Sequence, residues 1–300
     1  MSEVNILYTF DSKFSKLTAV SVYSLLKHKN KNSVYKIHFM TPPFTHGKKR
    51  IKKIAKKFNT QIVWHTVFKS PYKKHDYSRW SPVIFYRLFA YKKIHNIEKI
   101  LYLDSDTLIF KDLTSLYDTD MSSYVMGGIE DFGQTKVAKQ ELQQYIKDFV
   151  QKYTGNKPYI NSGVLLINLT ALSKFEQKLL GADIKLKYPD QDLINYVLNN
   201  HIKYLPQEYN LIYDQPFLLP DKPNPEDYAI IHCYSVKPYI YEYTPKKLFS
   251  TFCELAAEIK LYQDDFLKND IKYNKNDTKT VIPFIRVTNQ GIIKLLFIKY

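Results

Sequence analysis

The sequence predicts an α/β fold, with a mostly parallel central sheet, helices on both of its faces and a small helical, basic C-terminal tail. The first reason is that apolar runs alternate with helix-periodic segments through the first hundred residues. The second is a composition that is 45% hydrophobic with only 8 Gly in 300 residues, which is typical of a globular chain. The third is that Asp11 and Asp104 directly follow predicted strands. In a mostly parallel sheet, ligands bind at these C-terminal strand ends.

The first hundred residues contain four predicted strands and three predicted helices. The strands are the apolar runs at 4–10, 34–40, 61–67 and 99–103. The helices have apolar residues at helical spacing or a Pro in the first turn, and they cover 14–28, 48–58 and 82–94. Strand and helix alternating at this spacing indicate a parallel sheet.

The remainder of the chain is less regular. Strands are predicted at 125–129, at 161–169 and just before His232, and helices at 136–153, from Pro189 onward and at 246–262. Residues 269–280 are polar and linker-like, and residues 282–300 mix basic and apolar side chains. We therefore expect a main domain over 1–245 and a C-terminal helical extension over 246–300.

Nearly all of the net charge of +15 lies in the first quarter of the chain. Residues 12–75 contain 16 Lys and Arg and no Asp or Glu. The densest part is the helix predicted at 48–58, which has one apolar and one cationic face. The cationic face is either a solvated helix surface or an attachment site for an anionic membrane. Nucleic acid is not an expected partner, because the sequence has none of the usual nucleic-acid-binding motifs.

The cysteine count and the N-terminus indicate the compartment. Cys233 and Cys253 are too few for a disulfide framework, and the chain begins with a strand and not with the layout of a signal peptide. No apolar run reaches the about 18 residues of a membrane-spanning helix. The sequence therefore predicts a cytoplasmic protein with reduced thiols.

Asp104 and Asp106 interrupt an apolar stretch at the end of a predicted strand. Two carboxylates at i and i+2 in such a place are costly unless a cation lies between them, and hard divalent cations take oxygen ligands and leave positions for phosphate oxygens. The pattern predicts binding of a metal-chelated phosphate ester. The alternative is an ordinary turn, in which Asp and Ser side chains bond their own backbone.

Six segments occur in an order that resembles a known family. They are Thr9-Phe10-Asp11, Tyr86-Arg87, Asp104-Ser105-Asp106, Asn161-Ser162-Gly163, Pro189-Asp190-Gln191-Asp192, and His232 with Lys237-Pro238. Over roughly residues 4–240 the chain resembles the bacterial retaining glycosyltransferases of family 8. That family includes the lipopolysaccharide and lipooligosaccharide galactosyl- and glucosyltransferases and, more distantly, glycogenin.

The resemblance implies a GT-A fold, a UDP-sugar donor and a Mn²⁺ ion, or Mg²⁺ in its place. By position, Asp104, Asp106 and His232 would hold the metal. The donor-binding residues implied in the same way are Thr9, Asp11, Arg87, Asp104, Ser105, Asn161, Ser235 and Lys237. Among these, Asp11 would bond the uracil with Thr9 beside it, and Lys237 would contact the diphosphate. Arg87 would reach the sugar or a phosphate. The alternative interpretation is that Arg87 is an exposed charge on the surface of its helix.

The resemblance also implies the catalytic residues Gln191 and Asp190. Gln191 would lie on the far face of the donor sugar, and its amide would stabilise an oxocarbenium-like ion pair rather than act as a nucleophile. Asp190 would bond sugar hydroxyls, and it would at the same time suit a helix N-terminus.

The sequence departs from the family pattern in two places. Lys13 stands where an Asn usually follows the first motif. Lys237 comes five residues after His232 instead of six, Tyr239 replaces a Trp, and Ser235 stands where Gly is common. These departures affect two expectations. The first is the set of contacts to the base or ribose, and the second is the role of Lys237.

The predicted function is therefore retaining transfer of galactose or glucose from a UDP-sugar to a saccharide acceptor, most directly a lipopolysaccharide or cell-surface glycan precursor. The basic face at 48–57 and the tail at 282–300 predict peripheral attachment to the inner face of the cell membrane, next to a lipid-linked acceptor. A self-glucosylating, glycogenin-like role is the alternative within the family. A phosphatase of the haloacid-dehalogenase type is a weaker one, because Leu108 stands where that motif has Thr or Val and three strands precede it.

Overall fold

The computed structural model describes residues 3–72, 81–131, 140–212, 225–233, 238–239, 246–261, 265–266, 283–287 and 293–297. Its main sheet has seven strands in the order β3-β2-β1-β4-β7-β6-β8. Their bounds are Gln61–Thr66 for β3, Val34–Thr41 for β2, Glu3–Thr9 for β1, Lys99–Leu103 for β4, Ile160–Asn168 for β7, Met126–Glu130 for β6 and Ile202–Tyr204 for β8. Four of the six pairings are parallel, and those of β7 with β4 and with β6 are antiparallel. The predicted mostly parallel sheet is confirmed.

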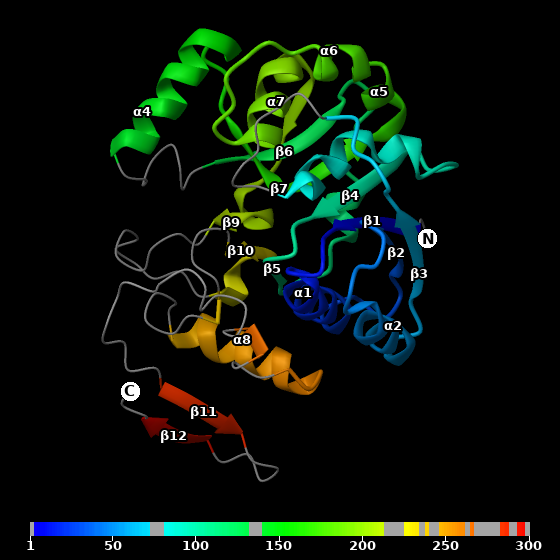
Figure 1. Cartoon of the computed structure of the whole chain (residues 1–300), viewed down its shortest axis with the longest axis vertical. Coiled ribbons are helices and arrows are strands. Elements are labelled where there is room, and N and C mark those ends of the chain that lie inside the picture. Colours follow the sequence, from blue (N-terminus) through cyan, green and yellow to red (C-terminus); the bar gives the residue numbers. More distant parts are fainter. Residues whose placement is uncertain are drawn as a thin grey trace.

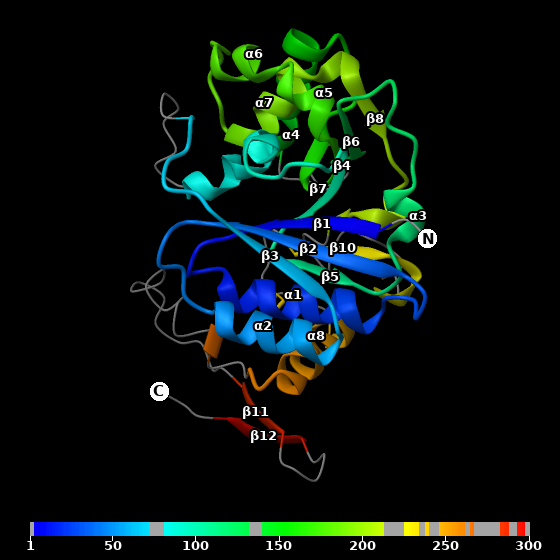
Figure 2. The same ribbon diagram turned by 90° about the vertical axis from the view of Figure 1, so that its right-hand side faces the viewer.

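Helices cover both faces of this sheet (Figures 1 and 2). On one face lie α1 (Ser15–Lys27), α2 (Lys48–Lys57) and α8 (Lys246–Glu258). On the other lie the 3-10 helix η1 (Pro82–Lys92), α5 (Leu169–Ser173), α6 (Glu176–Leu180) and α7 (Pro189–Val197). Side chains alternate between the faces along each strand, so Ile6 and Tyr8 join the first core while Leu7 joins the second.

The shorter elements complete the chain. They are β5 (Thr107–Ile109), α3 (Thr114–Tyr117), α4 (Gln140–Phe149), η3 (Val150–Thr154), η4 (Asn199–His201), η5 (Gln207–Tyr209), β9 (Leu211–Ile212), η6 (Pro225–Asp227), β10 (Ile230–His232), β11 (Pro283–Val287) and β12 (Ile293–Phe297). Strands β5, β10 and β9 form a second, three-stranded sheet, in which His232 pairs with Thr107. This small sheet brings the distant residue His232 next to the end of β4.

Two of the predicted helices have tighter or wider turns than an α-helix. The segment at 82–94 is the 3-10 helix η1, and Phe89 inside it has the non-helical angles φ −129 and ψ 25. Side chains that are aromatic or β-branched give this segment little preference for a regular α-helix. The helix expected at 136–153 is described from Gln140, and it ends in the π-turns of η3.

The C-terminal region begins as predicted and then differs. Helix α8 packs on α1, where Lys27 pairs with Glu258 at 2.7 Å, and its residues Leu248 and Phe252 belong to the main core. The expected helical extension does not continue to the end, because β11 and β12 form an antiparallel pair. Alternating Ile, Val, Phe and Leu favour strands over a helix there. The boundary at 245 stays a prediction. In the described residues, no helix is both long and apolar enough to cross a bilayer.

Candidate active site

The C-terminal ends of β1 and β4 open on one cavity of about 400 Å³. These two strands are parallel neighbours, with Ile6 opposite Leu101, so the residues that follow them meet at the same edge. The cavity is lined by Thr9, Phe10, Asp11, Lys13, Phe14, Ser81, Val83, Ile84, Arg87, Tyr102, Asp104, Ser105, Asp106, Asn161, Ser162, Tyr188, Pro189, Asp190, Gln191 and His232. Every predicted site residue that the structure describes is in this set.

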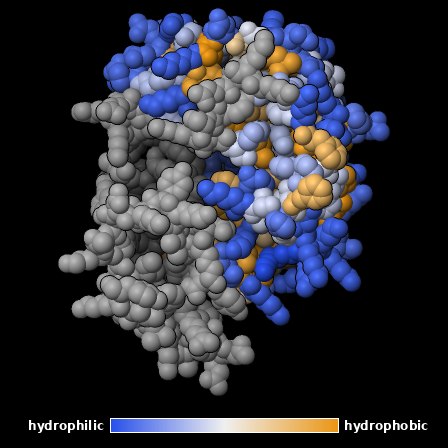
Figure 3. Space-filling model, viewed as in Figure 1, coloured by the Kyte–Doolittle hydropathy of each residue, from blue (hydrophilic) through white to orange (hydrophobic). Residues whose placement is uncertain are grey.

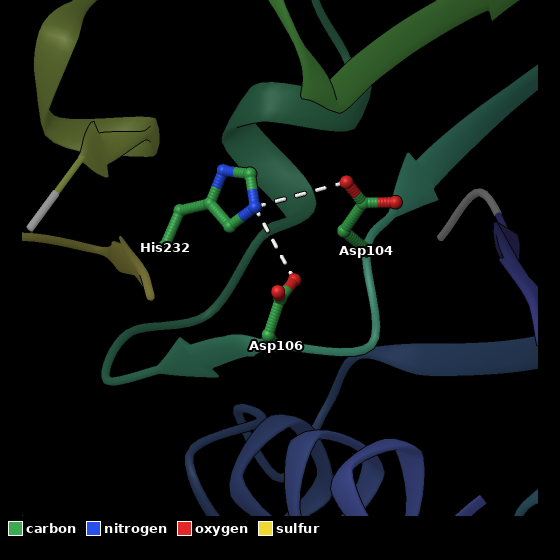
Figure 4. Close-up of side chains that lie close together, drawn as sticks. All are labelled: Asp104, Asp106 and His232. Atoms are coloured by element: carbon green, nitrogen blue, oxygen red, sulfur yellow. Dashed lines mark ion pairs between the residues drawn. The ribbon is translucent and has the colours of Figure 1, made fainter. Parts of the chain in front are cut away.

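Asp104, Asp106 and His232 form a compact group at the cavity wall (Figure 4). Each offers one ligand atom, and these atoms lie within 4.8 Å of one another. The imidazole Nε2 of His232 is 3.3 Å from Asp106 Oδ1 and 3.7 Å from Asp104 Oδ2. Two carboxylate oxygens and one imidazole nitrogen are a donor set that suits a divalent cation such as Mn²⁺ or Mg²⁺. The residues present therefore fit the expected metal.

Backbone pairing holds these three residues in place. Asp104 N–H donates to the carbonyl of Gly163 at 2.8 Å, which ties the end of β4 to β7. Cys233 N–H donates to the carbonyl of Asp106 at 2.9 Å, which extends the pairing of β10 with β5. The carboxylates thus sit on an edge shared by both sheets, and this position is set by the strand register.

Ser105, between the two carboxylates, lines the cavity but directs its hydroxyl toward helix α1. Its Oγ lies 2.8 Å from Thr18 Oγ1 on α1, and only 8% of the residue is exposed. Thr107 Oγ1 donates to the carbonyl of Asp104 at 2.8 Å. The Thr107 hydroxyl thus bonds the backbone of the Asp-Ser-Asp turn, whereas the Ser105 hydroxyl bonds helix α1. The turn and the metal group therefore occur together, and a contact of Ser105 with a donor stays a prediction.

Arg87 is buried and joins the metal group to the predicted sugar pocket. Its Nη2 donates to Asp104 Oδ1 at 3.0 Å, and its Nε lies 3.5 Å from Asp190 Oδ2. Its guanidinium carbon lies 4.0 Å from the centre of the Tyr102 ring. With 3% exposure, Arg87 is not the exposed helix charge of the alternative interpretation. Burial alone lowers an arginine pKa, but Asp104 and Asp190 outweigh it here and keep the Arg87 pKa above its usual value.

Asp190 and Asp192 both lie in the first turn of helix α7 but have different surroundings. Burial raises the pKa of Asp190, although Arg87 opposes the effect, and Asp190 Oδ2 accepts no hydrogen bond within the described residues. That oxygen is therefore suited to a ligand hydroxyl. Burial also raises the pKa of Asp192, whose Oδ2 accepts from the N–H groups of Lys187 and Tyr188 at 2.7 and 2.8 Å. Asp192 anchors the helix N-terminus and does not line the cavity.

Gln191 and Asn161 lie side by side in a hydrogen-bond network. Asn161 Nδ2 donates to Gln191 Oε1 at 3.1 Å, and Ser162 N–H donates to the same oxygen at 2.9 Å. Asn210 Nδ2 donates to Asn161 Oδ1 at 3.0 Å. A fifth member is Asp131, which directly follows Glu130 at the end of a short strand and belongs to no recognisable motif, so the sequence did not point to it. Asn210 was also missed, for the same reason.

The remaining predicted residues are Thr9, Asp11, Ser235 and Lys237. Thr9 Oγ1 lies 3.2 Å from the hydroxyl of Tyr102, and Asp11 Oδ1 accepts from Lys13 N–H at 3.0 Å. Both Thr9 and Asp11 line the cavity, as does Lys13. Ser235 and Lys237 lie outside the described residues, so their roles stay predictions.

Comparisons with known proteins agree with this architecture. Residues 5–241 match the family model described as glycosyl transferase family 8. A lipopolysaccharide 1,2-glucosyltransferase of Escherichia coli is 27% identical over 220 residues, which are 70% of this chain and 62% of that protein. A lipopolysaccharide 1,3-galactosyltransferase of Salmonella typhimurium is 24% identical over 248 residues, which are 78% of this chain and 71% of that protein.

The solved structures extend the comparison to the fold. The galactosyltransferase LgtC, determined with donor and acceptor sugar analogues, has a TM-score of 0.71 at 20% identity, and the match covers 89% of this chain and all of that one. At this identity the likeness shows the shared fold. The chain spans less than two thirds of the length of several curated relatives, including a putative glycosyltransferase of Haemophilus influenzae, of which it covers 63%.

Proposed function

Because the chain belongs to glycosyltransferase family 8, we propose that it transfers galactose or glucose from a UDP-sugar to a saccharide acceptor with retention of configuration. The observation that carries the proposal is the shared cavity. It brings together Asp104, Asp106 and His232, which could hold a cation, the buried Arg87, and the polar residues Asp190 and Gln191. That combination suits a substrate with both a diphosphate and a sugar.

The diphosphate end of the donor would bind at the metal group. Asp104, Asp106 and His232 would hold Mn²⁺, or Mg²⁺, and the ion would neutralise charge on the diphosphate leaving group. Thr9 and Asp11, at the C-terminal end of β1, would bind the uracil. Arg87 is held by Asp104 and Asp190, and this fixed guanidinium would contact the sugar or a phosphate.

The sugar end would bind between Asp190 and the two amides. Asp190 Oδ2 would accept from a sugar hydroxyl, which supplies the hydrogen bond that it lacks among the described residues. Gln191 would stabilise positive charge on the sugar ring as the bond to the diphosphate breaks. An amide is a poor nucleophile, so the acceptor hydroxyl would attack from the face that the diphosphate leaves, which retains the configuration.

The acceptor would be a lipopolysaccharide-type glycan carried on a lipid, and the enzyme would reach it from the cytoplasmic side of the membrane. The names of the Escherichia coli and Salmonella typhimurium relatives support a glycan acceptor over self-glucosylation. The family match and the position of Asp104 after three earlier strands count against the phosphatase alternative.

Surface features support peripheral membrane binding. Exposed lysines cover the outer face of α2, where Figure 3 shows hydrophilic side chains, and these are Lys49, Lys52, Lys53, Lys56 and Lys57. Phe44 and Phe68 are 93% and 81% exposed, and they follow the neighbouring strands β2 and β3 at the end of the sheet that carries the cavity. Apolar side chains beside a cationic surface are typical of attachment to anionic bilayers. The tail at 282–300 would add a second contact.

A donor screen tests the proposed function. UDP release from UDP-galactose, UDP-glucose, UDP-N-acetylglucosamine and UDP-N-acetylgalactosamine is measured with Mn²⁺, with Mg²⁺ and with chelator. We expect turnover with one of the first two donors, dependent on the metal and raised by a deacylated lipopolysaccharide core. Absence of UDP release from all four donors, with and without that acceptor, would refute the proposal.

A further inference from the structure

Asp131 is a fully buried carboxylate directly behind the two amides of the sugar pocket. It follows strand β6, it has 0% exposure, and it is not among the residues that line the cavity. Its Oδ2 accepts from Asn161 Nδ2 and from Gln191 Nε2, both at 3.2 Å. One carboxylate oxygen thus contacts the amides of Asn161 and Gln191, two of the residues that the family resemblance assigned to the donor.

The orientation of both amides follows from these bonds. A backbone N–H can only donate, so Ser162 N–H fixes which end of Gln191 is the carbonyl, and Gly163 N–H does the same for Asn161 at 2.8 Å. A carboxylate can only accept, so Asp131 requires an NH₂ group on the other side of each amide. Asn161, Ser162 and Gln191 line the cavity and Asp131 does not, so the carboxylate lies behind the two amides.

We propose that Asp131 is a positioning residue that sets the direction and polarity of the Gln191 amide. This inference rests on the proposed function. A negative charge on the NH₂ side of an amide draws its protons and shifts electron density toward the carbonyl oxygen. The Gln191 oxygen then carries more negative charge where positive charge develops on the sugar ring, and it needs no reorientation during the reaction.

The bond to Asp131 explains how the glutamine at position 191 can stabilise a cationic sugar ring. A neutral amide alone is free to turn and to present its NH₂ group, which would repel a cationic ring. Ser162 N–H and Asp131 together exclude that orientation, because the NH₂ group of Gln191 would then face a donor and its carbonyl would face the acceptor oxygen of Asp131. The carboxyl group of Asp131 itself stays buried behind the residues that line the pocket.

The test is a double-mutant cycle of Asp131→Asn and Gln191→Ala in the full-length chain with its donor and Mn²⁺. Asn keeps the shape of Asp131 but can turn a donor toward the amides. We expect Asp131→Asn to lower kcat on the order of ten- to a hundredfold while KM for the donor changes less than about threefold. The loss in the double variant should be clearly smaller than the product of the two single losses, because Asp131 acts in large part through Gln191 and otherwise contacts Asn161.

The matched control is Asp112→Asn. Asp112 also accepts several hydrogen bonds, among them those from Asn30 N–H and Tyr35 OH, at 2.9 and 2.8 Å, but it lies outside the cavity lining. This control should lower the melting temperature and leave kcat unchanged. Asp131→Glu, which keeps the charge, should retain more of kcat than Asp131→Asn.

Three results would overturn the inference. They are a wild-type kcat in Asp131→Asn, additive losses in the double variant, and loss of folding in both the Asn and Glu variants, which would assign Asp131 a structural role only. If the wild-type protein transfers hexose and Asp131→Asn does too at the same rate, this inference fails alone. If the wild-type protein transfers none, the proposed function fails.

Discussion

Gly163 in β7 and His232 in β10 lie so close that no larger residue fits at position 163. A Cβ added to Gly163 would come within 2.5 Å of Nδ1 of His232 and closer still to Cε1. The glycine is therefore required by the imidazole and not by its backbone angles. The two residues are 69 positions apart, and their contact fixes the position of His232 beside Asp104 and Asp106.

Gly163→Ala should displace the His232 ring and weaken Mn²⁺-dependent binding of UDP, by about ten- to a hundredfold. The strand itself tolerates Ala, so circular dichroism should show little change. The control is Gly127→Ala, which meets only side chains, at 3.1 Å or more, and lies outside the cavity. Calorimetric titration with UDP and Mn²⁺ measures the affinity of both variants. An unchanged affinity in Gly163→Ala would contradict a role for His232 as a metal ligand.

Asp106→Asn should abolish most transfer, with at least about a hundredfold loss of kcat/KM, because an amide is a weaker ligand than a carboxylate for a divalent cation. Chelator should have the same effect on the wild-type protein, and added Mn²⁺ should reverse it. UDP release and thermal unfolding are measured together. Full activity of the wild-type protein in excess chelator would exclude a metal role.

Gln191→Ala should lower kcat more than it weakens donor binding, as expected for a group that acts mainly in the transition state. The control is Gln144→Ala, an exposed amide on α4 that bonds Asp148. Product analysis by NMR should show an α-linked hexose from the α-linked donor. A β-linked product would contradict the retaining mechanism and the role given to Gln191.

Lys52→Glu with Lys53→Glu should reduce binding to anionic vesicles by about tenfold or more, because each Lys near such a surface contributes about 1 kcal/mol. Phe44→Ser with Phe68→Ser should reduce it as well, and so should removal of residues 282–300. The matched control is Lys174→Glu with Lys178→Glu, two exposed lysines on the opposite face of the sheet. Co-sedimentation at rising salt measures binding, and equal recovery with neutral and anionic vesicles would refute membrane attachment.

His38 should make the fold sensitive to acid. Burial, with further contributions from His65 and Lys36, lowers the His38 pKa from 6.5 to about 4. His38 Nδ1 lies 3.1 Å from His65 Nε2, and its Nε2 lies 3.2 Å from Asn5 Oδ1, so the buried ring is bonded on both sides in its neutral form.

Because the native pKa lies below the unfolded value, the unfolded chain binds the extra proton. The stabilisation is complete above pH 6.5 and is lost as pH falls toward 4, by about 3 kcal/mol in all. His38→Gln should remove this part of the pH dependence, while the exposed His46→Gln should not. Urea unfolding between pH 4 and 7 measures the slope, and identical slopes in wild type and His38→Gln would contradict the assignment.

Local patterns were enough to predict the order of the elements. Apolar runs and helical spacing predicted β1 to β4 and α1 and α2 within one or two residues, because each of these segments has one strongly apolar face or is apolar throughout. The family resemblance likewise predicted one site for Asp104, Asp106, His232, Asp190 and Gln191, and all five line the same cavity. The helical character of η1 was predicted, but its tight turns and the kink at Phe89 were not.

Only the tertiary structure decided how the site is supported. The burial of Arg87, the close approach of Gly163 to His232, and the network around Asp131 all depend on pairings between residues that are far apart in the sequence. An Asp that follows a short strand has no periodicity or motif to mark it. Its role comes from the antiparallel register of β6 and β7, which sets Asp131 beside Asn161, and from the packing of α7, which adds Gln191. Sequence patterns report the local preferences of the chain, whereas such contacts are fixed only when the sheets and helices close around a shared core.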